Sequence, residues 1–313
     1  MVSLMSKSPK KYDIIIIGGG PAGLSAGIYA ARARLASLLI ERGAIGGQII
    51  NAEWVENYPG FPDGVSGIDL TAAMHKQAEK FGLETLLADV TGVKLTGKQK
   101  TVETSGGSFT AKAVIIAIGL ERQKLGVPGE AEYTGKGVSY CATCDGAFFR
   151  DKPVVVVGGG NVAITEALEL TKFASAITVI HRRDELRATK ILQERACAEP
   201  KIKILWDSVV DEITGDAFVE KVKVSNVKTK KKSALNVAGV FMGVGFKANT
   251  DFLKGALELD KNNSIVTDVQ MATSVPGVFA AGDIRSGSVR QVIAATGDGA
   301  VAAISADRYI TGL

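Results

Sequence analysis

Four apolar runs, each followed directly by a glycine, organise the hydrophobic pattern of this chain. They cover residues 12–17, 113–118, 153–157 and 278–281. Runs rich in β-branched residues with almost no polar interruption are typical of strands buried on both faces of a parallel sheet. The pattern therefore predicts an α/β protein with parallel sheets.

The segments between these runs predict further elements. An alanine-rich helix is expected over residues 24–33 and a strand over residues 37–40, which ends at Glu41. Helical spacing returns from about residue 69 to residue 81, and short alternating strands follow to residue 109. The stretch 43–69 has neither periodicity, and long structured loops of this kind often face a ligand.

The first apolar run leads into a glycine-rich turn, Gly18-Gly19-Gly20-Pro21-Ala22-Gly23, which matches G-x-G-x-x-G. A strand precedes the turn, a helix follows it, and Glu41 lies 18 positions beyond Gly23. This is close to the spacing at which an acid meets a ribose hydroxyl in a dinucleotide-binding unit. The context favours a nucleotide site over a tight turn without a ligand.

A second unit repeats the first at an offset of 140 residues, since the turn Gly158-Gly159-Gly160-Asn161-Val162-Ala163 follows the third apolar run. Glu41 then corresponds to His181, which is followed by Arg182, Arg183 and Arg187. A carboxylate accepts from ribose hydroxyls and repels a 2′-phosphate, whereas arginines bind that phosphate. The first site therefore suits FAD or NAD, and the second suits NADP.

Cys141 and Cys144 form a Cys-x-x-Cys pair between the two turns, a spacing that serves either a redox pair or half of a zinc site. A structural zinc site needs four ligands, and the third cysteine, Cys197, stands alone in a segment where we expect it to be a small buried hydrophobe. Ligand counting therefore favours redox chemistry and no metal. Asp145, next to Cys144, is the best acid–base candidate; the alternative is a helix N-terminal acid without a chemical role.

Composition excludes several classes of protein. The 313 residues carry a net charge of only +4, which does not indicate nucleic-acid binding. The basic run 228–232 is predicted to be a solvated hairpin tip. Three cysteines do not make a secreted disulfide framework, and no apolar run reaches the ~20 residues that span a bilayer. Residues 1–11 lack the apolar core of a signal peptide and are expected to form a loose tail, so we expect a cytoplasmic protein without membrane contact.

These motifs together resemble the low-molecular-weight thioredoxin reductases, over essentially the full length of the chain. The matching stretches, in chain order, are Gly18–Gly23, Gly46–Gln48, Val55–Asn57, Cys141–Gly146, Gly158–Asn161, His181–Asp184, Gly282–Asp283 and Arg290–Gln291. The resemblance implies two Rossmann-like domains, the second inserted in the first. The FAD-binding domain would comprise residues 1–123 and 252–313, and the NADPH-binding domain with the redox cysteines residues 124–251. It also implies a homodimer, rotation of the inserted domain, and a thioredoxin-like protein as acceptor.

The resemblance also assigns site residues. The residues expected to bind FAD are Gly18, Gly20, Pro21, Ala22, Gly23, Glu41, Gly47, Gln48, Asn57, Gly119, Gly282, Asp283, Arg290, Gln291 and Val292. Those expected to bind NADPH are Gly158, Gly160, Asn161, Val162, His181, Arg182, Arg183 and Arg187. Cys144 would face the flavin, Cys141 would attack the incoming disulfide, and Asp145 would move the proton. Two departures from the family pattern are Val162, in place of a small polar residue, and Lys247-Ala248, where a proline usually precedes the asparagine.

Three functions are compatible with these residues. The first is an NADPH-dependent thioredoxin-disulfide reductase. The second is an FAD dithiol oxidoreductase that uses another electron donor or a small-molecule disulfide or dithiol. The third is a flavoprotein sensor that binds partners through its cysteine pair without turnover. The presence of the second glycine turn and its arginines favours the first.

Overall fold

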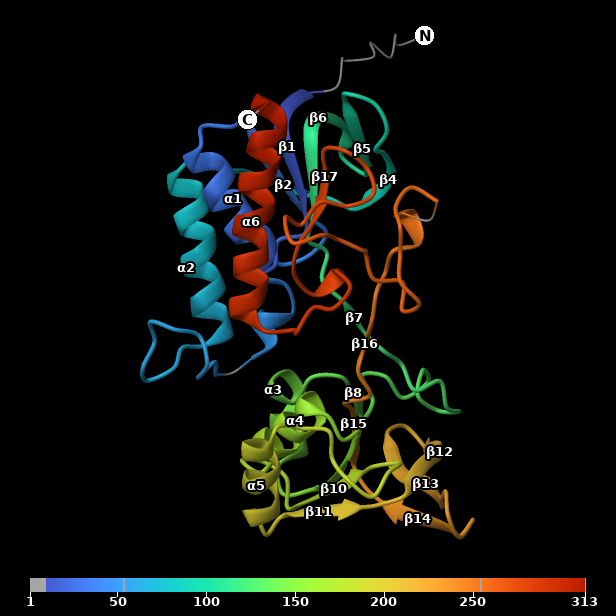
Figure 1. Ribbon diagram of the computed structural model, residues 1–313. Coiled ribbons are helices and arrows are strands. Elements are labelled where there is room, and N and C mark those ends of the chain that lie inside the picture. The colour runs from blue at the N-terminus through green and yellow to red at the C-terminus, as the bar shows by residue number, and fades with distance from the viewer. Residues whose placement is uncertain (1–9, 53, 254, 313) are drawn as a thin grey trace, which may run out of the picture. The chain divides into compact units, whose positions relative to one another are not determined.

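The chain folds into two compact units, seen in a computed structural model that describes residues 10–52, 54–253 and 255–312 (Figure 1). Unit 1 comprises the chain up to Glu121 and again from Lys247, and unit 2 comprises Arg122–Phe246. The predicted boundaries, after residue 123 and before residue 252, lie a few residues further along the chain. The chain crosses between the units in β7 (Glu121–Arg122) and β16 (Phe246–Lys247), which form a two-stranded sheet.

Unit 1 is built on a seven-stranded sheet in the order β3-β2-β1-β6-β5-β4, with β17 also paired to β6. The strands are β1 (Lys10–Ile17), β2 (Ser37–Glu41), β3 (Glu84–Leu87), β4 (Val90–Lys94), β5 (Lys100–Thr104), β6 (Gly107–Ile116) and β17 (Val278–Ala280). The pairs β1–β2, β2–β3, β1–β6 and β6–β17 are parallel, whereas β4, β5 and β6 pair antiparallel. The expected α/β class with parallel sheets is confirmed.

Three helices lie side by side along unit 1 in Figure 1: α1 (Pro21–Arg32), α2 (Gly67–Lys80) and α6 (Val292–Thr311). Small residues bring α1 and α6 together, because a Cβ on Gly299 would lie 2.1 Å from the carbonyl oxygen of Ala22. The Ser25 hydroxyl on α1 donates to the Thr296 carbonyl at 2.7 Å. Short 3₁₀ turns complete the unit: η1 (Gly47–Asn51), η3 (Asp251–Leu253) and η4 (Gly282–Ile284).

Unit 2 contains a five-stranded parallel sheet in the order β11-β10-β9-β15-β8 and an antiparallel sheet in the order β12-β13-β14. The strands are β8 (Val138–Ser139), β9 (Pro153–Val157), β10 (Ala176–Ile180), β11 (Ile202–Leu205), β12 (Ser208–Gly215), β13 (Val219–Asn226), β14 (Lys232–Asn236) and β15 (Gly239–Met242). The helices are α3 (Ala142–Asp145), η2 (Gly146–Phe149), α4 (Asn161–Leu170) and α5 (Lys190–Ala198). The basic run 228–232 is exposed at the hairpin tip, as predicted: residues 228–231 form the turn between β13 and β14, and Lys232 begins β14.

The internal duplication extends to strand register. In unit 1, Ile16 of β1 pairs with Leu39 of β2, and 140 residues later Val156 of β9 pairs with Val179 of β10. Both turns between strand and helix begin with a glycine at positive φ, Gly18 and Gly158. The two units therefore repeat the same strand–turn–helix–strand geometry.

The structure corrects several local predictions. One continuous strand, β6, covers both the last alternating strand and most of the apolar run that follows it, and it ends before residues 117–119. The stretch 43–69 includes η1, and α2 begins within it at Gly67. Lys10 and Lys11 belong to β1 rather than to a tail, while residues 1–9 lie outside the described part. Cys197 was predicted to be buried but is exposed, because α5 turns Ala196 toward the core instead.

Candidate active site and nucleotide-binding turns

The glycine turn of unit 1 is closed on one side and open on the other. A Cβ on Gly18 would lie 2.3 Å from the Ala117 carbonyl oxygen, and one on Gly23 would lie 1.8 Å from the carbonyl oxygen of Gly18. Gly20 precedes α1 as its N-cap, and no described side chain caps that helix. The first amides of α1, from Ala22 onward, are therefore left without a capping side chain, which is the arrangement that binds a phosphate group.

Glu41 ends β2 beside this turn and is fixed by two backbone amides. Its Oε2 accepts from Gly19 N–H at 2.7 Å, and its Oε1 accepts from Gly43 N–H at 2.9 Å. The carboxylate borders a cavity of about 150 Å³ at the carboxyl ends of the parallel strands. The cavity is lined by Ile17, Gly18, Ile40, Glu41, Arg42, Ala88, Asp89, Val90, Ile118, Gly119, Glu121, Asn249 and Phe252. The position of this cavity and the carboxylate at its border fit an adenosine group whose ribose hydroxyls lie near Glu41.

The rim of this cavity contains a network that the sequence did not predict. Glu121 Oε1 accepts from Asn249 Nδ2 at 2.9 Å and lies 2.7 Å from the Arg42 guanidinium. The Asn249 hydrogen bond, together with the nearby cations, lowers the pKa of the Glu121 carboxyl. The asparagine thus makes this contact although Ala248 stands where the family pattern has proline.

Other residues predicted to bind FAD lie together in unit 1 although they are distant in sequence. Asn57 Nδ2 donates to Gln291 Oε1 at 2.9 Å, and Gln291 is the N-cap of α6. Gly47, the first residue of η1, packs on the glycine turn, since a Cβ on it would lie 3.0 Å from the Gly20 Cα. Asp283 lies in η4, where burial raises the pKa of its carboxyl and the Arg290 cation opposes the rise.

The glycine turn of unit 2 resembles that of unit 1: its first glycine is packed against backbone, and its third glycine has free space around it. A Cβ on Gly158 would lie 2.3 Å from the Gly243 carbonyl oxygen, whereas a Cβ on Gly160 would meet nothing within 4 Å. Gly160 is the N-cap of α4, again without a capping side chain among the described residues. Asn161 Oδ1 accepts from the Thr189 N–H at 2.8 Å and so ties the loop after β10 to the turn. Val162 is half-buried on the same helix.

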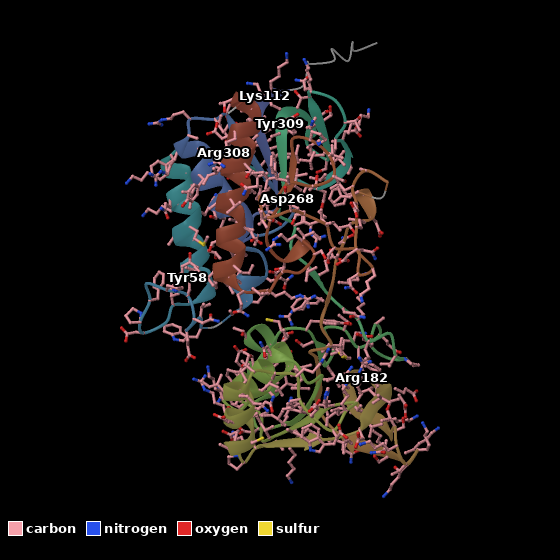
Figure 2. The ribbon with its side chains drawn as sticks, in the orientation of Figure 1. Tyr58, Lys112, Arg182, Asp268, Arg308 and Tyr309 are labelled. Atoms are coloured by element: carbon pink, nitrogen blue, oxygen red, sulfur yellow. The ribbon has the colours of Figure 1, made fainter. Side chains whose placement is uncertain are left out.

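Three arginines, Arg182, Arg183 and Arg187, are exposed on that loop (Arg182 is labelled in Figure 2). Among the described residues, no carboxylate forms an ion pair with them. The acids nearby are occupied by another cation, since Lys228 Nζ lies 2.8 Å from Asp184 and 3.0 Å from Asp207. Three free guanidinium groups beside an open glycine turn suit a doubly charged phosphate ester.

His181 is buried behind the turn rather than exposed with the arginines. A Cβ on Gly159 would lie 2.3 Å from its Nδ1, and its Nε2 lies 2.9 Å from the Glu185 carbonyl oxygen. Burial lowers the pKa of the imidazole, and the neighbouring arginines lower it further, so the ring is neutral at physiological pH. The neutral ring packs against Gly159 and, through its contact with the Glu185 carbonyl oxygen, supports the loop that carries the arginines.

The cysteine pair lies at the start of α3, shortly after β8: Cys141 precedes the helix and Cys144 is within it. Cys141 is half-buried and disulfide-bonded, and it directly precedes the four-residue helix. The side chain of Cys144 lies outside the described part of the structure, and so does its predicted place against the flavin. Thr143 Oγ1 donates to Glu169 Oε2 on α4 at 2.7 Å and anchors the outer face of α3.

Asp145, the last residue of α3, is held by a serine that the sequence did not single out. Ser139 Oγ donates to Asp145 Oδ2 at 2.6 Å and accepts from the Cys141 N–H at 3.1 Å. Ser139 lies only two residues before Cys141, so a search for side-chain partners within one turn of the pair could have found it.

The described residues contain neither a candidate metal site nor a candidate membrane span. Within that part of the chain, no group of three or more His, Cys, Asp or Glu side chains could hold a metal ion. None of its helices has both the length and the apolar character needed to cross a membrane.

Comparison with known proteins agrees with this geometry. The family described as pyridine nucleotide-disulphide oxidoreductase matches residues 12–299. The chain is 46% identical to the thioredoxin reductase of Peptoclostridium litorale over 305 residues, which cover 96% of this chain and 97% of that protein. This chain belongs to the thioredoxin reductase family.

Solved structures of the thioredoxin reductase family match the fold closely. The crystal structure of Lactococcus lactis thioredoxin reductase superposes with a TM-score of 0.94 at 44% identity, covering 96% of this chain and 100% of that one. That of the T. acidophilum enzyme gives a TM-score of 0.91 at 35% identity, covering 97% and 99%. Membership makes the chain an oxidoreductase of the flavoprotein class, with two Rossmann-like dinucleotide-binding domains.

Proposed function

We propose that this protein is an NADPH-dependent thioredoxin-disulfide reductase that uses FAD and the Cys141–Cys144 pair. The observation that carries the proposal is that Cys141, in a disulfide, directly precedes the short helix that ends in Asp145. The same unit has its own nucleotide turn, and on the loop after β10 it exposes three arginines that form no ion pair with any described carboxylate. A carrier of reducing equivalents and a disulfide centre in one unit are what such a reductase requires.

Unit 1 fits FAD. Gly18, Gly20 and Gly23 leave room for a pyrophosphate, the backbone amides of Ala22 and Gly23 can donate to it, and Glu41 is fixed where it can accept from a ribose. The remaining residues proposed to contact FAD are Gly47, Gln48, Asn57, Gly119, Gly282, Asp283, Arg290, Gln291 and Val292. The joining of Asn57 to Gln291 supports this set, because it brings the two halves of the discontinuous unit to one place.

Unit 2 fits NADPH. Gly158, Gly160 and Asn161 would cradle the pyrophosphate, with Val162 behind them, and Arg182, Arg183 and Arg187 would bind the 2′-phosphate. His181 would support the arginine loop rather than bind phosphate, since its ring is buried and neutral. When bound, the nicotinamide and the flavin supply the two electrons that reduce the cysteine pair.

The chemistry of the protein's own residues is thiol–disulfide exchange. In the reduced pair, the Cys141 thiolate attacks one sulfur of the acceptor disulfide; an S–S bond forms to Cys141 and the acceptor's own S–S bond breaks. The released acceptor thiolate takes a proton from Asp145. Asp145 recovers a proton from the Cys144 thiol, whose sulfur then attacks Cys141. The second acceptor thiolate leaves and takes that proton from Asp145, and the Cys141–Cys144 disulfide is restored. The acceptor gains two electrons and two protons.

We also propose that the acceptor is a thioredoxin-like protein and that the enzyme acts as a homodimer in the cytoplasm. A reducing compartment keeps most thiols reduced, so a disulfide there usually cycles rather than serving as a permanent link. Sedimentation of the purified holoprotein at micromolar concentration tests the dimer.

An anaerobic absorbance experiment tests the function. NADPH, NADH or reduced ferredoxin is added to the purified flavoprotein, loss of the visible flavin band is followed, and oxidised thioredoxin is then added. We expect NADPH to bleach the flavin and thioredoxin to restore its colour. Bleaching by reduced ferredoxin but not by NADPH would replace the proposed donor, and restoration by a small disulfide but not by thioredoxin would replace the acceptor.

Cysteine variants assign the thiol roles. Cys141→Ser is expected to keep flavin reduction by NADPH and to lose thioredoxin reduction, because the attacking sulfur is missing. Cys197→Ser is the matched control, since Cys197 is exposed on α5 and outside the site. Full thioredoxin reduction by Cys141→Ser contradicts the assignment.

A further inference from the structure

Ser139 connects the two chemically important ends of the redox helix. It is the last residue of β8 and is 4% exposed. Its hydroxyl lies 2.6 Å from Asp145 Oδ2 and 3.3 Å from the Cys141 carbonyl oxygen, and it accepts from the Cys141 N–H at 3.1 Å. A serine hydroxyl has a single proton, and the short contact to the carboxylate takes it.

The short helix that follows Cys141, α3, does not by itself fix the Asp145 side chain. Four residues make one turn, and a single turn is marginal without outside support. Its outer face is tied by Thr143 to Glu169 on α4, a contact that does not reach Asp145. Within the described part of the chain, the hydrogen bond from the Ser139 hydroxyl therefore orients this carboxylate.

The same hydroxyl also fixes the backbone at the attacking cysteine. Because it accepts from the Cys141 amide while donating to Asp145, the carboxylate and the start of α3 are held at a constant separation. A proton donor must remain within hydrogen-bond reach of the group that receives its proton. One buried residue thus supplies that constraint between the nucleophile's backbone and the acid.

We propose that Ser139 is a positioning residue that holds Asp145 in place to protonate the thiolate released from the acceptor disulfide. This inference rests on the proposed function, in which Asp145 is the acid. A structural cap for α3 would use only the Cys141 contact; the additional donation to the carboxylate gives the hydroxyl an effect on proton transfer.

A double-mutant cycle separates these roles. Ser139→Ala, Asp145→Asn and the double variant are assayed for thioredoxin turnover as a function of pH, with flavin bleaching by NADPH as a second readout. We expect Ser139→Ala to lower turnover about tenfold in the native background. In the Asp145→Asn background we expect less than about a twofold effect, because coupled residues are not additive. The pH profile of turnover should change with Ser139→Ala in the native background and stay unchanged in the Asp145→Asn background, which lacks the acid that the serine positions.

Several results would overturn the inference. Equal losses from Ser139→Ala in both backgrounds, or an unchanged pH profile, would mean that the serine acts only as a cap. Ser37→Ala is the matched control, because Ser37 is equally buried and its hydroxyl donates to the Leu35 carbonyl far from the cysteines. If native protein turns over thioredoxin and Ser139→Ala equals it, only this inference fails; if native protein does not, the proposed function fails first.

Discussion

Arg122 Nη1 lies 2.5 Å from Glu166 Oε1, while the second carboxylate oxygen of Glu166 has no hydrogen-bond partner among the described residues. Arg122 is in the strand by which the chain enters unit 2, and Glu166 is buried on α4. A buried carboxylate that is only half satisfied is costly to ionise. This pair therefore makes the stability of unit 2 sensitive to pH.

The first prediction concerns that sensitivity. Burial raises the pKa of Glu166 to about 8 despite Arg122, against 4.5 for an ordinary carboxyl. Between these values the folded state binds more protons than the unfolded state, so stability is highest below about pH 4.5 and falls as pH rises toward 8. Glu166→Gln should remove this dependence of stability on pH, which amounts to about 5 kcal/mol across the interval. Melting temperatures at a series of pH values measure it.

The control for this prediction is Glu194→Gln, an exposed acid on α5 of the same unit. It should leave the pH dependence as it is in the native protein. A Glu166→Gln protein whose melting temperature still falls with pH in parallel with the native one would show that other groups produce the slope.

The second prediction concerns the choice of nucleotide. Arg182→Ala and Arg183→Ala should each raise the KM for NADPH about tenfold, because each removes a charge-assisted hydrogen bond to the 2′-phosphate. The KM for NADH, which lacks that phosphate, should stay within about twofold. Stopped-flow flavin reduction provides both values. Lys203→Ala, an exposed cation on β11, is the control, and a parallel loss for both nucleotides would remove the arginines from the phosphate site.

The third prediction contrasts two glycines of one turn. Gly158→Ala should prevent unit 2 from folding normally, because its φ is 140° and the added Cβ would lie 2.3 Å from the Gly243 carbonyl oxygen. Gly160→Ala should fold, since nothing lies within 4 Å, but its methyl group would enter the space needed by the pyrophosphate. Melting temperature and NADPH binding distinguish the two. Normal NADPH affinity in Gly160→Ala would contradict the proposed pyrophosphate position.

The fourth prediction concerns retention of FAD. Asp298 on α6 receives two hydrogen bonds from Arg285, at 2.6 and 3.0 Å, and one from the Gly282 N–H at 3.1 Å. Asp298→Ala leaves a largely buried guanidinium without its partner, which costs about 3 kcal/mol. It also frees the turn that holds Asp283, so FAD should dissociate faster. Flavin fluorescence on dilution measures the release.

Asp307→Ala is the matched control for that experiment. Asp307 lies on the same helix, and its side chain makes no ion pair among the described residues. It should retain FAD as the native protein does. Unchanged flavin release from Asp298→Ala would show that the Arg285 pair does not support the turn.

The features that could be predicted from sequence are those fixed by neighbours along the chain. Gly18 and Gly158 are required by turns that directly follow a buried strand, and their repetition at one offset made the second site visible. Arg182 and Arg183 followed from that repeat, because their position was specified before their chemistry was considered. The alternation of apolar residues likewise located most strands.

The features that could not be predicted depend on contacts between distant segments. Asn57 meets Gln291 only because the discontinuous unit closes, and Arg122 meets Glu166 only because β7 packs near α4. Cys197 was misjudged for a related reason: its neighbours are apolar enough to suggest burial, but a rotation of one residue on α5 decides which side chain faces the core. Local composition does not fix that rotation.

The discontinuity of unit 1 has a consequence for protein synthesis. β17 and α6, which pair with β6 and pack on α1, come from the last 36 residues of the chain, whereas unit 2 is complete at Phe246. On the ribosome, domains generally fold as units once they have emerged. The inserted unit is therefore expected to resist protease on nascent chains that stop before β17, while the segments around it are still cleaved. Unit 2, whose synthesis begins after that of unit 1, is therefore expected to finish folding before unit 1 does.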